Sequence, residues 1–290
     1  MFGKFFGTHR KKHPFARFSK LSDQEWLKVL TRSINEPVID GVAMPGFPSD
    51  EIQTNSVGSA GAQTLLQAFN FYLVVKRYGE RLGRPIKGAS VLDFGCAWGR
   101  ILRFFLRDCE PKDIWGIDVD PEFLSVCINT IADCNFLVVD PLPPTQLGDA
   151  SFDIVIAFSV FSHLAEHASL RWVQEFSRIL KPKGIMVVTT QGRDFIELCR
   201  SLRGRDHEFQ WYRTLANCFV DSDAAYAAYD AGKYLHSPTG GGAYRPSDFY
   251  GETLIPEGYV LAHWTEYLRL ADFVDDRNVL PQALIVMQKE

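Results

Sequence analysis

The chain has 290 residues, of which 46% are apolar, 13% aromatic and 23% charged. These are ordinary values for a globular protein, and they exclude a fibrous or wholly disordered chain. The longest apolar runs are much shorter than the roughly 20 residues that a membrane-spanning helix needs, so we do not expect an integral membrane protein.

The first twenty residues are basic, whereas the rest of the chain is acidic. This segment has no acidic residue and six basic ones: Lys4, Arg10, Lys11, Lys12, Arg17 and Lys20. Because the whole chain has a net charge of −4, the remaining residues carry −10, which disfavours nucleic acid as a partner. We expect residues 1–20 to form a mobile, disordered tail. Phenylalanines interleave with the charges, so the alternative is a weak contact with an anionic membrane surface.

The six cysteines are typical of a reduced, cytoplasmic protein. They form no C-x-x-C pair and lie mainly in apolar stretches, so the sequence predicts neither a disulfide framework nor a zinc site. No His/Asp/Glu cluster has the spacing of metal ligands, and we expect no metal requirement. The basic N-terminal run is not followed by the apolar segment of a secretory signal, which also favours the cytoplasm.

Residues 21–88 are predicted to be a helical lead-in and cap. A short helix is expected over residues 23–30. A longer amphipathic helix is expected over residues 60–83, where apolar side chains recur every three or four positions. The Pro/Gly-rich stretch between them, residues 44–58, is predicted to be a loop with a role in function.

A regular alternation of strands and helices begins at residue 89 and continues to residue 191. Five β-rich runs are separated by helical patterns, at residues 89–94, 113–118, 135–140, 152–158 and 184–190. Such a series predicts an α/β fold, with a doubly wound, mostly parallel sheet that helices cover on both faces.

The alternation of strands and helices ends after the fifth β run. Residues 192–256 contain helical, aromatic and glycine-rich stretches and are predicted to be an insertion within the same domain. Residues 257–290 then contain two strand-like runs, 258–270 and 282–289, which we expect to complete the sheet.

The sharpest signal is the run VLDFGCAWGR at residues 91–100. It is typical of a buried strand that ends in Asp93, a turn that contains Gly95 and Gly99, and the start of a helix. Glycines let the backbone approach a ligand closely, and a helix start offers free N–H groups. Nineteen residues beyond Gly99 the next strand ends in Asp118, which is placed to accept hydrogen bonds from ribose hydroxyls. Together these features predict a ligand that contains a nucleoside.

The turn differs from that of a dinucleotide site. A nicotinamide cofactor needs G-x-G-x-x-G to accommodate its pyrophosphate, whereas Ala97 and the bulky Trp98 stand between the two glycines here. A nicotinamide-dependent oxidoreductase is therefore the less favoured alternative. The motif resembles instead that of the class I S-adenosylmethionine-dependent methyltransferases, whose first motif has the form hhDhGCGxGR. The resemblance covers residues 89–191 well and residues 257–290 loosely.

This resemblance implies a Rossmann-like methyltransferase core with an antiparallel last strand, and it assigns a cofactor site. The loop expected around the amino acid part of S-adenosylmethionine contains Asp93, Gly95, Cys96 and Gly99. Asp118 matches the acid that binds the ribose. Asp140 matches the acid near the adenine, although Pro141 follows it where the family has a residue with a free N–H. Phe158 and Ser159 match residues that lie under the methionine portion.

Catalytic and acceptor-binding residues are less strongly indicated, because an activated sulfonium needs mainly a positioned acceptor and the exclusion of water. His163 follows the fourth strand and is a candidate general base for an acceptor hydroxyl; helix capping or packing is the alternative. We predict a small polar acceptor, such as a sugar or another hydroxyl-bearing metabolite. Candidate acceptor-binding residues lie in the stretch 45–61 and in the insertion: Asn55, Ser59, Tyr234, His236, Tyr244 and Arg245.

The insertion is predicted to be a lid. Gly240–Gly242 give its backbone unusual freedom, and aromatic residues flank them on both sides. We expect it to close over the acceptor, so that loss of the glycine-rich stretch lowers turnover and leaves cofactor affinity nearly intact. Alternatively, the tyrosines of the insertion only pack this segment and do not contact the acceptor, and the sequence favours neither interpretation. A different class of function is a domain that binds the cofactor without catalysis, as a sensor or scaffold. The sequence gives no signal for an oligomeric state.

Overall fold

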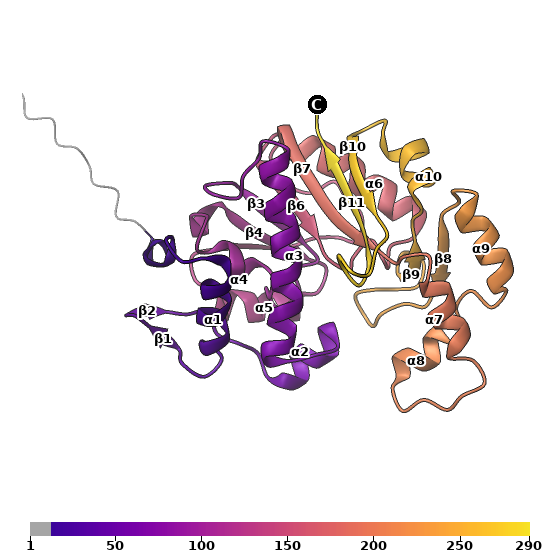
Figure 1. Cartoon of the computed structure of the whole chain (residues 1–290), viewed down its shortest axis with the longest axis horizontal. Coiled ribbons are helices and arrows are strands. Elements are labelled where there is room, and N and C mark those ends of the chain that lie inside the picture. Colours follow the sequence, from indigo (N-terminus) through magenta and orange to yellow (C-terminus); the bar gives the residue numbers. More distant parts are fainter. Residues whose placement is uncertain (1–12) are drawn as a thin grey trace, which may run out of the picture.

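The computed structural model describes residues 13–290 (Figure 1). The chain is packed from the start of this range, because the 3₁₀ helix η1 (Pro14–Phe18) buries Phe15 and Phe18. The Phe18 ring lies 5.3 Å from that of Trp26. The predicted tail boundary at residue 20 is therefore wrong. Lys4, Arg10, Lys11 and Lys12 lie outside the described residues, and a membrane contact through them stays a prediction.

A seven-stranded sheet forms the centre of the fold, in the order β10-β11-β7-β6-β3-β4-β5. Its strands are β3 (Val91–Phe94), β4 (Ile114–Asp118), β5 (Asn135–Val138), β6 (Phe152–Ala157), β7 (Leu180–Thr190), β10 (Arg269–Val274) and β11 (Ala283–Gln288). The first five strands pair in parallel, whereas β11 is antiparallel to both β7 and β10. This confirms the predicted mostly parallel sheet with an antiparallel end. The strand order reverses between β3 and β6, and ligands bind beside such a point at the carboxyl ends of the strands.

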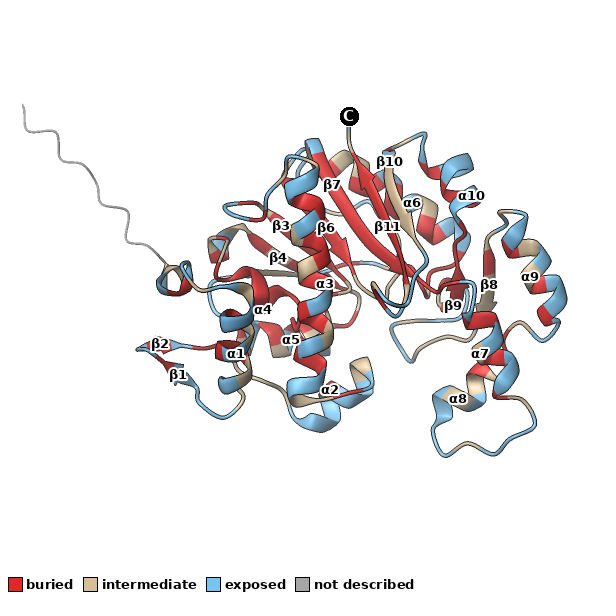
Figure 2. Cartoon of the chain, viewed as in Figure 1, coloured by how far each residue is buried: buried red, intermediate tan, exposed pale blue. Residues whose placement is uncertain are grey.

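Helices cover both faces of the sheet (Figures 1 and 2). One face packs on α1 (Asp23–Arg32), α3 (Gly61–Arg81), α4 (Leu102–Phe105) and α5 (Pro121–Thr130), and the other on α6 (Glu166–Ile179). Alternate residues of β7 point to opposite faces of the sheet. Val187 packs in the apolar core under α1, α3, α4 and α5, and Val188 packs in the core under α6. Strands buried on both faces give continuous apolar runs, which explains the pattern in the sequence. No helix among the described residues is long and apolar enough to cross a membrane.

Two segments differ from the predicted elements. Part of the predicted loop at 44–58 is helix α2 (Asp50–Val57), whose first turn is capped by Ser49 and whose end is set by Gly58 at φ +77°. The helix was missed because it has little apolar periodicity and is mostly exposed. The run at 258–270 is not one strand. It forms α10 (Glu257–Tyr259) and a π-helical turn, η3 (Val260–Trp264), before β10 begins.

The insertion has a small apolar core of its own. It contains α7 (Phe195–Ser201), α8 (Gln210–Leu215), α9 (Ser222–Asp230) and the antiparallel pair β8 (Leu235–Pro238) and β9 (Gly251–Leu254). Single bridges join it to the main domain, from Tyr250 to Leu164 and from Leu254 to Gln191. Its last part therefore lies beside the carboxyl ends of β6 and β7. The remaining short elements are β1 (Val38–Ile39), β2 (Val42–Ala43) and η2 (Pro111–Asp113).

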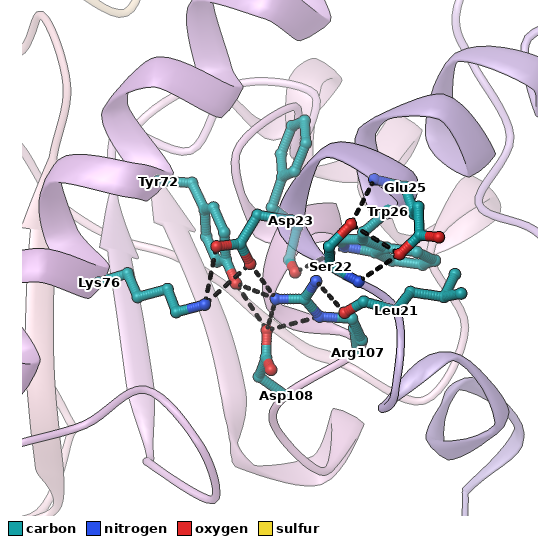
Figure 3. Close-up of polar contacts among 10 residues, drawn as sticks. Leu21, Ser22, Asp23, Glu25, Trp26, Tyr72, Lys76, Arg107 and Asp108 are labelled. Atoms are coloured by element: carbon teal, nitrogen blue, oxygen red, sulfur yellow. Dashed lines mark hydrogen bonds and ion pairs between the residues drawn. The ribbon is translucent and has the colours of Figure 1, made fainter.

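A polar network ties α1 to the main domain (Figure 3). The buried Arg107 donates to Asp23 Oδ1 at 2.6 Å and to Asp108 Oδ2 at 3.0 Å. Tyr72 donates to the same Asp108 oxygen at 2.6 Å, and Lys76 reaches Asp23 at 2.8 Å. Burial raises the pKa of Asp23, but hydrogen bonds from Lys76 and Arg107 outweigh it and leave that pKa lowered. The N-terminal segment is thus anchored by charge as well as by its phenylalanines.

Candidate cofactor and acceptor site

A cavity lies at the carboxyl ends of β3, β4 and β6, beside the point where the strand order reverses. The main domain contributes the glycine loop after β3, the end of β4 and the segment after β6 to its wall, and α2, α3, α5 and the insertion also contribute residues. The predicted residues that line it are Gly95, Cys96, Asp118, Phe158, Ser159, His163 and Arg245. The structure therefore brings together seven of the residues that the sequence singled out, from segments up to 150 positions apart.

The glycine loop is held in a left-handed conformation at three positions. Gly95 has φ +71°, and a β-carbon there would lie 2.4 Å from Val160 Cγ2. Ala97 has φ +46° at the position where the methyltransferase motif has its middle glycine. Gly99 has φ +76°, but a β-carbon on it would meet Ile131 Cδ1 at 2.4 Å, and Gly99 does not line the cavity. The absence of a side chain there lets the loop pack against Cys127 of α5 and against Ile131, which follows it, rather than giving the ligand contact that we expected.

Asp118 is buried at the end of β4 and holds the loop in place. Its Oδ2 accepts a hydrogen bond from Ala97 N at 2.9 Å, and its Oδ1 accepts one from Asp120 N at 3.0 Å. Burial raises the pKa of Asp118, and the two amide hydrogen bonds offset part of that effect. Each carboxylate oxygen can accept a further hydrogen bond. The group therefore fits a ligand with two neighbouring hydroxyls, such as a ribose.

Asp93 and Arg100 are a second pair of buried charges near the loop. Asp93 is 1% exposed, its Oδ2 has no hydrogen-bond partner among the described residues, and burial raises its pKa well above the usual range. Arg100 lines the cavity, and burial lowers its pKa to about 10. Its hydrogen-bond partners are neutral, Gln67 at 3.2 Å and Thr64 at 3.5 Å. Asp93 itself does not line the cavity, whereas the Arg100 guanidinium does and fits a ligand that carries a carboxylate.

Cys96, Phe158 and Ser159 form the floor of the cavity. Burial raises the pKa of the Cys96 thiol, so it is a neutral wall. The Phe158 ring packs on Phe71 at 4.9 Å and under the Arg100 guanidinium at 5.3 Å. Ser159 has φ +60°, and Gln282 donates to its hydroxyl at 2.9 Å. These contacts fix the segment after β6 in one conformation.

His163 lies in the wall of the same cavity and is held by the insertion. Its Nδ1 is 2.8 Å from the carbonyl oxygen of Gly251, and its ring stacks on Tyr250 with 4.8 Å between centroids. A carbonyl oxygen only accepts, so Nδ1 carries the proton and Nε2 of the neutral ring is an acceptor. The helix-capping alternative does not apply, because α6 begins at Glu166 and no side chain caps it.

Asp140 and most of the expected acceptor-binding residues do not line the cavity. Asp140 is exposed beyond the end of β5, and its neighbour Pro141 lines the wall instead. Asn55 is exposed on α2, whereas the next two residues, Ser56 and Val57, face the cavity. The hydroxyl of Ser59 is buried without a partner among the described residues, away from the cavity.

The insertion contributes fewer of its aromatic residues than expected. Tyr234 packs inside the fold and donates to the carbonyl of Leu164 at 2.8 Å. His236 bonds to Thr253 Oγ1 at 2.8 Å, and Tyr244 is on the surface. None of the three lines the cavity.

Three other residues of the insertion reach the cavity: Arg245, Phe249 and Tyr250. Arg245 Nη2 is 3.5 Å from Asp120 Oδ2, and the backbone N–H of Asp120 donates to Asp118. The expectation that loss of the glycine-rich stretch leaves cofactor affinity nearly intact therefore conflicts with the position of Arg245.

Residues 13–290 contain no group of three or more His, Cys, Asp or Glu side chains that could hold a metal ion. The cavity instead offers acceptors and donors from Asp118, Arg100 and the glycine loop. The absence of a metal requirement stays a prediction.

Comparison with known proteins gives the family of the central domain. Residues 91–184 match the family model described as "Methyltransferase domain". The chain contains a class I S-adenosylmethionine-dependent methyltransferase domain. The glycine loop, Asp118, His163 and the sheet up to β7 lie in or directly beside the matched range, whereas α2 and the insertion lie outside it.

Curated relatives of this methyltransferase domain are moderately similar. A ubiquinone biosynthesis O-methyltransferase of Azorhizobium caulinodans is 29% identical over 145 residues, which cover 48% of this chain and 55% of the relative. Methyltransferase adrK of Penicillium roqueforti is 29% identical over 122 residues, 38% of this chain and 44% of the relative. The chain thus spans about half the length of the curated relatives it matches.

A solved structure supports the fold. An S-adenosylmethionine-dependent methyltransferase from Clostridium acetobutylicum superposes with a TM-score of 0.51 at 12% identity, and the match covers 77% of this chain and 91% of the other. At this identity the likeness supports the Rossmann-like fold alone.

Proposed function

We propose that this chain transfers a methyl group from S-adenosylmethionine to a hydroxyl oxygen of a small acceptor, with His163 as general base. The observation that carries the proposal is the position of His163. Its Nδ1 is bound to the Gly251 carbonyl, which leaves Nε2 as a proton acceptor in the cavity that also contains Asp118 and the glycine loop. The names of the curated relatives include O-methyltransferases, which supports an oxygen acceptor.

The cofactor residues divide the cavity into two parts. Asp118 would bind the ribose hydroxyls, and Arg100 would hold the carboxylate of the amino acid end. S-adenosylmethionine would supply a methyl group that leaves its sulfonium sulfur, with the bonding pair kept by sulfur, as the acceptor oxygen bonds to the carbon. His163 Nε2 takes the proton that the hydroxyl releases. The apolar wall around it keeps water from the reacting atoms.

The lining near His163 favours an aromatic hydroxyl over a sugar. Tyr250, which stacks on His163, and Leu164, the next residue in the chain, both line the cavity and suit a flat, apolar ring. A phenol has an ordinary pKa of about 10, so an imidazole base removes its proton far more easily than that of a sugar hydroxyl. We therefore favour a small phenolic acceptor, with the sugar that the sequence suggested as the competing candidate.

The insertion is proposed to close this site. Its loop between β8 and β9 carries Arg245, Phe249 and Tyr250 into the cavity wall, and Gly240 and Gly242 have positive φ values within it. Such a loop can change conformation without steric strain. Closure by it would shield both the cofactor and the acceptor.

The test is transfer of labelled methyl from S-adenosylmethionine to a panel of phenols, sugars and carboxylates. We expect transfer to a phenol, with a rate lowered about 10²- to 10⁴-fold in His163→Gln. His167→Gln is the matched control, because His167 is exposed on α6 and does not line the cavity. Transfer to a sugar or carboxylate in preference would contradict the phenolic acceptor. Cofactor binding without any transfer would favour the sensor or scaffold.

A further inference from the structure

Three consecutive residues of the insertion, Tyr250, Gly251 and Glu252, converge on His163. The Tyr250 ring stacks on the imidazole with an interplanar angle of 11°, and the Gly251 carbonyl accepts from Nδ1 at 2.8 Å. The Glu252 carboxylate lies behind the same nitrogen, with Oε2 3.7 Å from Nδ1. At that distance the contact is electrostatic, because it is too long for a hydrogen bond.

Glu252 is an unusual residue for its place. It is 3% exposed, and a buried carboxylate is costly unless it is paired or hydrogen-bonded. Its Oε1 accepts from Trp211 Nε1 at 3.1 Å, and its Oε2 lies 3.4 Å from Gln191 Nε2. Both partners are neutral. Among the described residues, its ion-pairing contact is His163, and that pair forms fully when the imidazole gains a proton.

The position between Tyr250 and Glu252 requires a glycine. A β-carbon on Gly251 would lie 2.1 Å from the carbonyl oxygen of Ser237 and 2.8 Å from His236 Cε1. The close pairing of β9 with β8 therefore fixes the carbonyl that orients the imidazole. Because Glu252 is the next residue in β9, the same pairing fixes its carboxylate.

We propose that Glu252 is a positioning residue for methyl transfer: its carboxylate stabilises the imidazolium that forms when His163 accepts the acceptor's proton. This rests on the proposed role of His163 as general base. An opposite charge at this distance favours the protonated ring, so it strengthens Nε2 as a base while Gly251 keeps Nδ1 as the donor.

The other groups around His163 increase the need for a negative charge. Arg245 lines the same cavity and carries a like charge to the imidazolium. Tyr250 is neutral, because burial raises its pKa to about 12. His236 on β8 and His167 on α6 also lie near, and burial lowers the pKa of His236, which keeps it neutral. Glu252 is thus the negative group that the imidazolium meets first.

A simpler reading is that Glu252 only pins α8 to β9 through Trp211. Two variants distinguish the electrostatic role of Glu252 from this structural role. Glu252→Gln removes the charge and keeps an acceptor for the indole, whereas Trp211→Phe removes the indole N–H and keeps the charge. Trp211 is 48% exposed, so its replacement leaves the core intact.

We expect Glu252→Gln to lower kcat about 10-fold or more, a part of the about 10²- to 10⁴-fold that a general base supplies. KM and the affinity for S-adenosylhomocysteine should change little. Trp211→Phe should leave kcat near the wild-type value, because it keeps the Glu252 charge beside His163. An unchanged kcat in Glu252→Gln, or equal loss of kcat in both variants, would overturn the proposal.

A second measurement does not depend on turnover or on the folding of Glu252→Gln. The ¹⁵N shifts of His163 in the wild-type protein, assigned with His163→Gln, report which nitrogen carries the proton. We expect the Nδ1–H tautomer at neutral pH, and an Nε2–H tautomer would overturn the proposal. If the tautomer is as expected but His163→Gln transfers methyl at the wild-type rate, the proposed general base is wrong, and the role of Glu252 falls with it.

Discussion

Replacing Asp118 by asparagine tests the cofactor site at its most constrained residue. Both carboxylate oxygens already accept a backbone N–H, from Ala97 and Asp120. Asparagine has one acceptor oxygen, so its NH₂ must face one of these two donors. The substitution also removes the negative charge of the carboxylate, whose oxygens would accept hydrogen bonds from the ribose hydroxyls. A hydrogen bond to a charged group contributes about 1.5–3 kcal/mol, and loss of one therefore weakens binding about 10- to 100-fold.

The assay is calorimetric titration of Asp118→Asn with S-adenosylhomocysteine. Asp140→Asn is the matched control, because Asp140 is exposed and does not line the cavity. A surface change of that kind costs no more than about 0.5 kcal/mol, or about a factor of two in affinity. If folded Asp118→Asn binds as tightly as the wild type, Asp118 is not the ribose ligand. A large loss in Asp140→Asn would restore the adenine role that the sequence suggested.

Further expected outcomes follow from the loop, the α1 anchor and the insertion. Gly95→Ala should weaken binding of S-adenosylhomocysteine, and adding Val160→Ala should restore part of it by removing the 2.4 Å clash; no rescue would contradict the packing argument. Asp23→Asn should lower the melting temperature at neutral pH, and because the pKa of Asp23 is lowered, the difference should begin to shrink as the pH falls below the ordinary value of 3.8 and vanish once the pH has passed the lowered pKa; a difference that does not shrink with falling pH would refute the charge contribution. Hydrogen exchange over residues 234–252 should slow with S-adenosylhomocysteine alone, since Arg245 lies beside Asp120, and slow further with acceptor; equal protection in all states would reject the lid. Full activity should persist in excess chelator, and loss restored by magnesium or zinc would show a metal requirement.

The sheet and the glycine loop were predictable because their signals are local. A strand buried on both faces is apolar throughout, and a glycine turn followed by an acid at the next strand end needs no tertiary information. Asp118, Gly95 and Phe158 were found in this way and all line the cavity. Gly99 was placed in the correct turn, but its partner, Ile131, lies 32 positions later, and sequence alone does not show that contact.

Residues that reach the site from other elements were harder to predict. Asn55 and Ser56 are neighbours on α2, and each step along a helix turns the side chain by about 100°. One is therefore exposed while the next lines the cavity. A helix prediction for residues 50–57 would have been needed to choose between them. The capping serine at 49 and the acids at 50 and 51 were the available signal.

Arg100 and Glu252 were missed for different reasons. Arg100 ends the glycine motif itself, so the motif carried the signal, but its burial beside neutral partners appears only in the structure. Glu252 ends the predicted glycine-rich stretch and has no motif of its own. Its position depends on the pairing of β9 with β8 and on the bridge from Tyr250 to Leu164. Long-range strand pairing of this kind has no local signature in a single sequence.

A crystal structure of the chain with S-adenosylhomocysteine tests the central claim most directly. The account predicts that the nucleoside occupies the cavity at the ends of β3, β4 and β6, with both ribose hydroxyls within about 3.2 Å of the Asp118 carboxylate oxygens. The sulfur should face the end of the cavity that His163 lines. A ligand bound elsewhere, or one whose ribose leaves Asp118 without contact, would contradict it.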